Sequence, residues 1–500
     1  MEDEKPKKFG MPGVRYLFAI NGLLGFMVSY SMRLNINVAI VAMVNNTALH
    51  NQNNETYSNE CRATDPISNN SMVDDNPKDG EFVWSPHIQG LVLGAFYYGY
   101  CVTQIPGGRL AELVGGKWVI GLANLATALL TLLVPTAARI HVGLLVAVRV
   151  MQGLAQGLVT PAMNSMLARW TPETERGLLY TLVHAGTNIG SLTTMSFAGV
   201  LAGSDVLGGW PACFYLFGLF GCLWFFLWAV LITDTPQTHP FITKKELKYI
   251  TSNQKIETNK KLPPVPWRKI ACSIPFWSLI VTQTCQDWSY YTIMTDLPTY
   301  FATMLHFRIE TNGFLSSIPH FLQTIVGLVV SSVTDLIVRR GLASPQFVRK
   351  FCNSVSGFGT SLGLVAVCLS GCDVNKNVAL FMFSVAIGGF CYSGHELTLL
   401  DLSPEYAGTL YGIANTISNL TGFLTPLVVG ALTDGNQTLG QWHIVFGITS
   451  GLLAFASVVF VIFSTTQKQD WAVTSPAIKD VTMDVPECSS INRKAYKRLT

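Results

Sequence analysis

Charge is scarce in this sequence. Only 13% of the 500 residues are Asp, Glu, Lys or Arg, whereas a soluble globular domain carries about 25%. The net charge of +3 is too small to indicate a nucleic-acid partner. We therefore expect neither a water-soluble domain nor a nucleic-acid-binding protein.

The motifs of enzymes, metal sites and ATP-driven pumps are also missing. The sequence contains no Walker A loop, no HExxH or CxxC motif, and no cluster of Cys and His ligands. Most of the 11 cysteines sit inside apolar segments, where cysteine acts as a small packing residue. We predict that the protein is not an enzyme, binds no metal as a cofactor and needs no organic cofactor.

What the sequence has in abundance is long uncharged apolar runs, which recur from Leu17 to Phe463. A helix needs about 20 residues to cross the roughly 30 Å hydrocarbon core of a bilayer. The runs predict twelve membrane-spanning helices, in two sets of six near residues 16–44, 87–112, 117–136, 143–168, 178–202 and 211–233, and 274–303, 312–337, 347–370, 377–400, 406–432 and 443–464.

A polar segment rich in Lys and Arg separates the two sets. We therefore predict an all-α membrane protein with two pseudo-symmetric six-helix bundles. The expected regions are a cytoplasmic N-terminus (1–15), an N-terminal bundle (16–233) with a glycosylated lumenal or extracellular loop (45–86), a cytoplasmic linker (234–273), a C-terminal bundle (274–465) and a cytoplasmic tail (466–500).

Two signals predict the orientation. Of the 33 Lys and Arg residues, two (Arg33 and Arg149) lie well inside spans and five lie in the odd-numbered loops. The other 26 lie in the N-terminus, the even-numbered loops including the linker, the tail, or the span ends that border these loops. The positive-inside rule then places both termini in the cytosol. Independently, the first and last odd-numbered loops contain N-x-[ST] glycosylation sequons, which must face the lumen or exterior, at Asn45, Asn54, Asn69 and Asn436.

The two halves repeat an acidic residue at a helix end. Glu112 ends the second span, and Asp335, followed by Arg339, ends the eighth. Such an acid facing basic residues of a short loop can form a latch between helices that holds one conformation. Topological signalling by solvated loop charges is an equally good explanation. Repeated halves that rock about a central site are a common plan of transporters.

Two arginines lie inside the predicted membrane. A charge at the bilayer centre costs about 2.5–3.5 kcal/mol even on lenient insertion scales, so Arg33 and Arg149 need a function. Gln152 and Gln156 share the helix face of Arg149. A cation with amide donors and no carboxylate suits an anion. The alternatives are that Arg149 lies near an interface and that Arg33 pairs with an acid of the other half.

Asp287, Asp296 and Glu396 are the acids available for such a pair. Asp296 lies near a helix end, where a solvated or capping role is as good an explanation. His395 and Glu396 are adjacent, and together they could relay protons, bind a cation or join helices. We regard Asp287, His395 and Glu396 as candidates for coupling transport to an ion.

Several long motifs occur in order and carry a family resemblance. Residues 33–40 (RLNINVAI), 99–108 (GYCVTQIPGG), 149–176, 297–300 (LPTY), 312–319 (NGFLSSIP), 400–407 (LDLSPEYA) and 442–446 (WHIVF) are the matching stretches. On these motifs the chain resembles the anion–cation symporter branch of the major facilitator superfamily. This branch comprises type I sodium-dependent phosphate transporters, sialin and vesicular glutamate transporters.

The resemblance implies a twelve-helix fold that works by alternating access around a central anion site. Arg33 and Arg149 match the substrate arginines of spans 1 and 4 in this family. Tyr98 and Tyr291 match tyrosines that line the site in sialin-like members, and Asn415 matches a polar position of span 11.

The departures from the family pattern concern proton transfer. Proton-coupled members carry acids at the positions of Gln152 and Gln156, and many have histidine at Asn164. The vesicular glutamate transporters have a histidine at the position of Leu93 and an arginine at that of Gln286. An amide cannot release a proton, so the pattern favours the phosphate and organic-anion members, for which sodium coupling is described.

We therefore expect a monomeric secondary transporter of inorganic phosphate or a small organic anion, with sodium as co-substrate, in the plasma membrane rather than a lysosomal or vesicular one. The alternative is a proton-coupled, sialin-like exporter of acidic sugars or amino acids. In that case His395, Glu396 or Asp287 would replace the missing acids of span 4.

Overall fold

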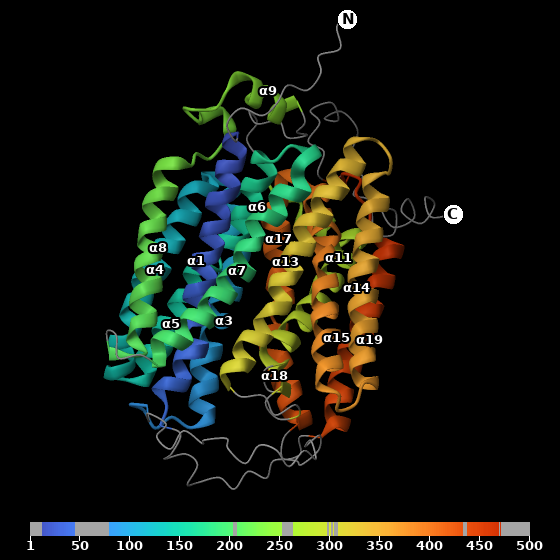
Figure 1. The fold of residues 1–500 in the computed structure, drawn as a ribbon. Coiled ribbons are helices and arrows are strands. Elements are labelled where there is room, and N and C mark those ends of the chain that lie inside the picture. Colours follow the sequence, from blue (N-terminus) through green and yellow to red (C-terminus); the bar gives the residue numbers. More distant parts are fainter. Residues whose placement is uncertain are drawn as a thin grey trace, which may run out of the picture.

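The computed structural model describes residues 13–45, 80–203, 208–252, 264–297, 300–301, 304, 309–433, 438–469 and 471. Apart from one isolated bridge between Val44 and Phe82, the regular elements in these ranges are helices. The helices form two groups that stand side by side, blue to green and yellow to red in Figure 1.

The N-terminal half consists of six helical rods. They are α1 (Val14–Met43), α3 (Pro86–Val114), α4 (Gly116–Ile140), α5 (Val142–Gln156) continued by α6 (Val159–Trp170), α7 (Arg176–Gly203) and α8 (Pro211–Leu231), with the short helix η1 (Glu173–Glu175) before α7. Gly115 joins α3 to α4 at φ +113°, a conformation that favours glycine.

The C-terminal half repeats this plan with more breaks. It consists of α11 (Ile274–Tyr291) with η4 (Thr292–Asp296), α13 (Ile309–Arg339), α14 (Pro345–Leu369), α15 (Val374–Ile387) with η5 (Gly388–Ser393) and α16 (His395–Leu402), η6 (Pro404–Tyr406), α17 (Ala407–Ser418) with α18 (Thr421–Thr433), and α19 (Leu439–Phe463). Short helices in the linker are η3 (Pro236–Thr238), α9 (Lys244–Ser252) and α10 (Trp267–Ala271).

The composition of the rods fits a membrane. Within the described residues, nine helices are long and apolar enough to span a bilayer. With α3, α7 and the α11–η4 rod they make twelve. The rod α7 is more polar because it buries Thr181, His184 and Asn188 in the protein interior. Large apolar side chains of α8, α14 and α19 are exposed on the outer surface, where lipid would cover them.

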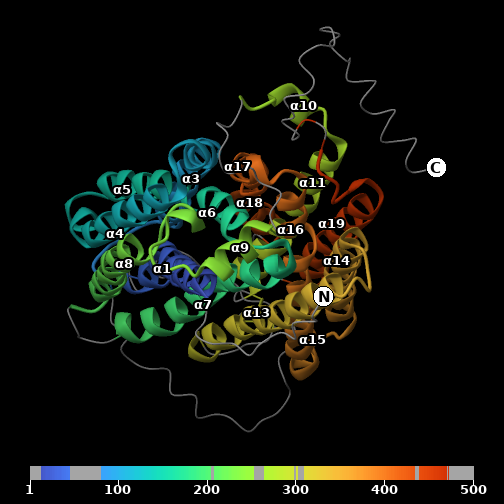
Figure 2. The same cartoon turned by 90° about the horizontal axis from the view of Figure 1, so that it is seen from above.

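The two halves meet along two pairs of helices. In the view from above, α7 lies beside α13 and α3 beside α17 (Figure 2). Gly108 approaches Gly408 so closely that a Cβ on Gly108 would lie 2.1 Å from the carbonyl oxygen of Gly408. Small residues permit such approach of helix backbones in membranes.

One end of the molecule gathers both described ends of the chain and the linker. Glu246 of α9 accepts hydrogen bonds from the backbone N–H groups of Val14 (3.0 Å) and Arg15 (3.2 Å) at the start of α1. The backbone N–H of Gln469 donates to the carbonyl of Leu402 at the end of α16. We call this end the linker end (Figure 1, top).

Candidate functional site

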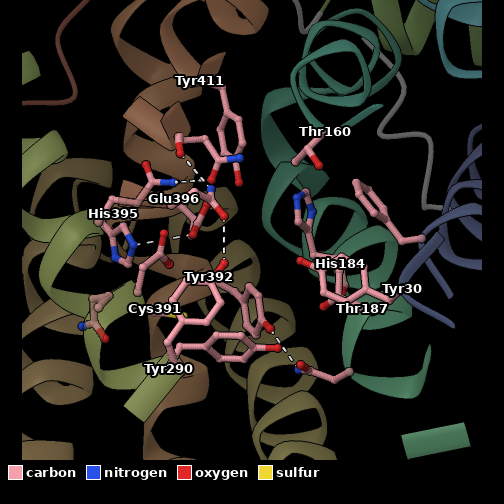
Figure 3. A pocket seen from close by; sticks show the side chains of 18 of the residues that line it. Tyr30, Thr160, His184, Thr187, Tyr290, Cys391, Tyr392, His395, Glu396 and Tyr411 are labelled. Carbon is pink, nitrogen blue, oxygen red and sulfur yellow. Dashed lines mark hydrogen bonds and ion pairs between the residues drawn. The ribbon is translucent and has the colours of Figure 1, made fainter. Parts of the chain in front are cut away.

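A polar cavity of about 140 Å³ lies between the two halves. Its wall is built by α1, α3, α6 and α7 from one half and by α11, α13, η5, α16, α17 and the α17–α18 break from the other. Figure 3 shows Tyr30, Thr160, His184 and Thr187 facing Tyr290, Cys391, Tyr392, His395, Glu396 and Tyr411. The broken rods help to build this wall, since Cys391 and Tyr392 belong to the short helix η5.

Arg33 does not itself line this cavity and lies behind a frame of aromatic rings. The centre of its guanidinium lies 4.8 Å from the ring centroids of Tyr97 and Tyr100, 5.0 Å from Phe96 and 5.4 Å from Tyr30. Tyr30 and Tyr100 also line the cavity. The side chain is 5% exposed, so the rings take the place of water around the cation.

The hydrogen bonds of Arg33 leave donors for a ligand. Its Nη2 donates to the hydroxyl of Tyr291 at 3.3 Å, and this hydroxyl donates to Oδ1 of Asn419 at 2.8 Å. In the described part of the chain Arg33 makes no salt bridge. A guanidinium has five N–H donors, so an anion that enters from the cavity could take those that remain.

Arg149 lies deeper and does not reach the cavity. It is 2% exposed, so its guanidinium does not extend to the protein surface. Its Nη1 donates to Gln152 at 3.1 Å and its Nη2 to the backbone carbonyl of Arg33 at 3.3 Å. Arg149 therefore supports the helix that carries Arg33 and adds positive charge to the same wall.

Gln152 and Gln156 are likewise placed behind the wall. Nε2 of Gln152 donates to Thr131 at 2.8 Å, and Nε2 of Gln156 donates to the backbone carbonyl of Ser29 at 2.6 Å. Neither side chain lines the cavity. The two amides thus join α5 to α4 and α1, which is a structural role that the sequence motif did not distinguish from ligand binding.

The tyrosine that lies near Arg33 is Tyr97, and not Tyr98 as the family resemblance implied. The side chain of Tyr98 is 58% exposed on the outer surface, whereas the ring of Tyr97 lies beside both Arg33 and Tyr291. Neighbouring residues of an α-helix point about 100° apart, so a shift of one position separates the interior from the lipid. The helical spacing of Tyr97, Tyr100 and Gln104 is the sequence signal that could have found the inner face.

The polar residues of span 11 meet the N-terminal half at Asn415. Its Nδ2 donates to Oε1 of Gln104 on α3 at 2.7 Å, and its Oδ1 accepts from Gln283 of α11 at 3.3 Å. Asn415 lines the cavity. Tyr291 and Asn415 are therefore both placed at the site, on the side opposite α1.

The acidic residues lie on the C-terminal side of the cavity. Asp287 and Glu396 both line it, together with His395. Oε1 of Glu396 lies 3.6 Å from Nε2 of His395, and Oε2 accepts a 2.7 Å hydrogen bond from the hydroxyl of Tyr180 on α7. The side chain of Asp296 lies outside the described residues. The cavity thus has two carboxyl groups in its C-terminal wall, and the Arg33 cation lies behind the rings of its N-terminal wall.

The acids at the helix ends bind the opposite half. Glu112 accepts hydrogen bonds from the backbone N–H and the hydroxyl of Thr409, both at 2.7 Å. Asp335 accepts from the backbone N–H groups of Gly177 at 3.3 Å and Leu178 at 2.8 Å. Both acids therefore hold the first turn of a helix in the other half, where free N–H groups and the helix dipole favour a negative charge.

Arg339 does not complete this latch. Its side chain is exposed, and in the described ranges it forms no salt bridge with Asp335. The expected pairing of an acid with a loop cation is wrong for this residue, because Asp335 already has its partners in the backbone of α7.

Of the four sequons, one lies among the described residues. The backbone N–H of Asn45 donates to the carbonyl of Phe82 at 2.8 Å, at the end of α1 that is opposite the linker end. Asn54, Asn69 and Asn436 lie outside the described residues.

Helical rods in two halves, with a polar cavity between them and hydrogen bonds that join the halves at the linker end, are the architecture of a membrane transporter. The Major Facilitator Superfamily model matches residues 22–426. In a solved structure of a superfamily transporter, FucP, in the outward conformation, the fold is similar with a TM-score of 0.59 at 13% identity, over 89% of this chain and 99% of that one.

The more similar relatives place the chain within the superfamily. Sialin of Ovis aries is 37% identical over 92% of this chain and 91% of its own. A putative inorganic phosphate cotransporter of Drosophila melanogaster is 37% identical over 91% and 86%, and vesicular glutamate transporter 1 of Bos taurus is 35% identical over 93% and 79%. The chain belongs to the major facilitator superfamily, in its anion–cation symporter group, and is a transporter rather than an enzyme.

Proposed function

We propose that this protein moves inorganic phosphate or a small organic anion across the membrane together with sodium. The observation that carries the proposal is Arg33, a buried cation behind the rings of the cavity wall, with one hydrogen-bond partner in the described part of the chain. A cation held in this way by aromatic rings can receive an anion without first breaking a salt bridge.

The opposite wall supports cation coupling. Asp287 and Glu396 would repel a bound anion but attract a cation. An anion near Arg33 and a cation near the two carboxyl groups would leave the loaded site closer to neutral, which lowers the cost of closing it away from water. Sodium fits because the wall offers carboxylate, amide and hydroxyl oxygens, the ligands that hard cations prefer.

The relatives support the substrate class. One is named as an inorganic phosphate cotransporter and another as a glutamate transporter, and both substrates are anions. The proposal places the protein as a monomer in the plasma membrane, with cytosolic termini and glycans on the opposite side. Loss of the expected glycans when Asn54 and Asn69 are replaced, and labelling of intact cells by a membrane-impermeant reagent, test this placement.

A proton-coupled exporter of acidic sugars or amino acids is the second candidate. The contact of His395 with Glu396 and the hydrogen bond from Tyr180 favour it, because all three groups can exchange protons. In the sodium proposal the same carboxylate binds the metal ion instead.

Uptake into proteoliposomes separates these candidates. Labelled phosphate, glutamate and an acidic sugar are offered under an inward sodium gradient at constant pH, and under a pH step without sodium. Uptake that requires sodium supports the leading proposal, and uptake driven by the pH step alone supports the exporter. No gradient-driven uptake of any anion contradicts both.

The Arg33 variants test the anion site. We expect Arg33→Gln to abolish gradient-driven uptake, since it removes the cation that faces the anion. Arg33→Lys keeps the charge but not the planar array of donors, so we expect it to retain about 1–10% of the activity, with a raised KM. Full activity of Arg33→Gln, in protein that elutes as wild type by size exclusion, would contradict the proposal.

A further inference from the structure

Glu396 lies at once in the cavity wall and in the contact between the two halves. The first two turns of α7 hold the C-terminal half by four side-chain contacts near the linker end, which we call the α7 gate. Its contacts are Arg176 with Asp401 (3.2 Å), the N–H groups of Gly177 and Leu178 with Asp335 (3.3 and 2.8 Å), Tyr180 with Glu396 (2.7 Å) and Thr181 with Ser331 (2.7 Å).

The four partners of the α7 gate differ in their access to the cavity. Asp401, Asp335 and Ser331 do not line it, whereas Glu396 does. Figure 3 shows Glu396 beside His395 in the wall of the cavity. In the described part of the chain, a cation in the cavity therefore has direct access to this gate through one carboxylate, that of Glu396.

From this juxtaposition we infer that the hydrogen bond between Tyr180 and Glu396 makes opening of the linker end depend on the cation bound at Glu396. The inference rests on the proposed cation coupling and names the residue that transmits it. Tyr180 is a positioning residue, because it touches the carboxylate and not the transported anion.

The physical reason is competition for one acceptor. A hydrogen bond to a charged carboxylate is roughly twice as strong as one between neutral groups. A sodium ion that coordinates Glu396, or a proton that neutralises it, weakens this acceptor, so the Tyr180 hydroxyl holds the two halves less tightly. The remaining contacts of the α7 gate do not touch the ion and stay as they are.

The groups that surround Glu396 come from every element packed around it. They are Tyr180 and His184 of α7, Asp287 of α11, Cys391 and Tyr392 of η5, His395 of α16 and Tyr411 of α17. From α14, which packs on α16, Arg349 donates to Asp401 and to the backbone carbonyl of Ser393. The ring of His184 stacks on Tyr180 with a centroid distance of 4.0 Å, and this contact survives when only the hydroxyl of Tyr180 is removed.

The test compares Tyr180→Phe with Thr181→Val. Both variants remove one hydrogen bond of the α7 gate and keep the shape of the side chain, but only the first concerns a carboxylate of the cavity. Spin labels on Val114→Cys and Leu342→Cys report the opening, since both positions are 70–71% exposed and lie in opposite halves at the linker end. The parent protein without the two introduced cysteines, treated with the same spin-label reagent, serves as the blank for labelling of native cysteines.

In otherwise wild-type protein reconstituted in lipid, we measure the distance between the two spin labels. We expect the ratio of long to short distances to rise when sodium is added at constant pH, or when the pH is lowered without sodium. The arm that responds identifies the cation. We expect Tyr180→Phe to start about tenfold more open and to change less than twofold with the ion. Thr181→Val should also start more open but keep the full response of the wild type.

An equal ion response in Tyr180→Phe and wild type overturns the inference, and so does a wild type that responds to neither cation. Should Tyr180→Phe fail to fold, Glu396→Gln replaces it, and we expect its distances to be independent of both cations. The readout needs no known substrate. Absence of anion uptake therefore counts against the proposed function, whereas an unaltered response in Tyr180→Phe counts only against the role of Tyr180.

Discussion

The burial of Arg33 shows how a charge can be kept in a membrane without a salt bridge to any residue that the structure describes. Insertion of an arginine costs about 2.5–3.5 kcal/mol or more, and a cation–π contact contributes about 0.5–2 kcal/mol. Four rings within 5.4 Å of the guanidinium centre can therefore offset much of this cost. A salt bridge would stabilise the charge as well, but it would also compete with an incoming anion.

This frame predicts different effects for two neighbouring tyrosines. We expect Tyr97→Leu to raise the KM for the anion about threefold to thirtyfold, because it removes one cation–π contact and the edge contact with Tyr291. Tyr98→Leu is the matched control, since its side chain faces outward, and uptake should stay within twofold of the wild type. Uptake kinetics in proteoliposomes measure both, and a larger effect of Tyr98→Leu would refute this assignment.

At this scale the sequence predicts which residue types matter better than where they point. Arg33 stands out because any arginine in an apolar run needs a reason. The rotation of α3 about its axis determines that Tyr97 faces Arg33 and Tyr98 faces outward. A sequence motif that contains both tyrosines does not determine this rotation. The contact of Tyr180 with Glu396 joins residues 216 positions apart, so no local pattern predicts it.

At the scale of helices, the breaks in the rods determine the site. The rod of α15, η5 and α16 changes to a tighter helix at Gly388–Ser393 and then reverts to an α-helix at His395. This change brings Cys391, Tyr392 and Glu396 to one cavity. Hydropathy predicted the rods because an apolar run of this length has few structures other than a helix available in a bilayer. It did not predict the breaks, because the residues at a break are uncharged and leave the hydropathy of the run unchanged.

Close helix packing in the N-terminal half gives a stability prediction. A Cβ on Gly153 would lie 2.0 Å from the carbonyl oxygen of Phe96, whereas a Cβ on Gly451 of α19 would have nothing within 4 Å. We expect Gly153→Ala to lower the midpoint of thermal unfolding in detergent by at least several degrees, since α5 must move away from α3. Gly451→Ala should leave the midpoint unchanged or raise it slightly.

Both variants are compared by the loss of the monodisperse peak after heating. A Gly153→Ala protein as stable as the wild type would show that α3 and α5 can separate without cost. That result would also weaken the role given to Arg149, which lies on the same helix and depends on the same packing.

At the scale of the whole molecule, the internal repeat extends to the contacts that close the linker end. Glu112 at the end of α3 binds the start of α17, and Asp335 at the end of α13 binds the start of α7. The positions of both acids were predictable from the repeated sequence. Their partners were not, because a backbone N–H group at a helix start leaves no signature in the side-chain pattern, and the sequence suggested Arg339 instead.

The two latches should act independently on one global equilibrium. They share no hydrogen-bond partner, so we expect Glu112→Gln and Asp335→Asn each to increase the ratio of linker-open to linker-closed protein about fivefold to tenfold, because each loses a charged acceptor at a helix start. In the double variant the two factors should multiply. Distances between spin labels at Val114→Cys and Leu342→Cys give the three ratios. A double variant no more open than either single one would mean that one latch already opens when the other is lost, and the two halves would then not move as rigid bodies.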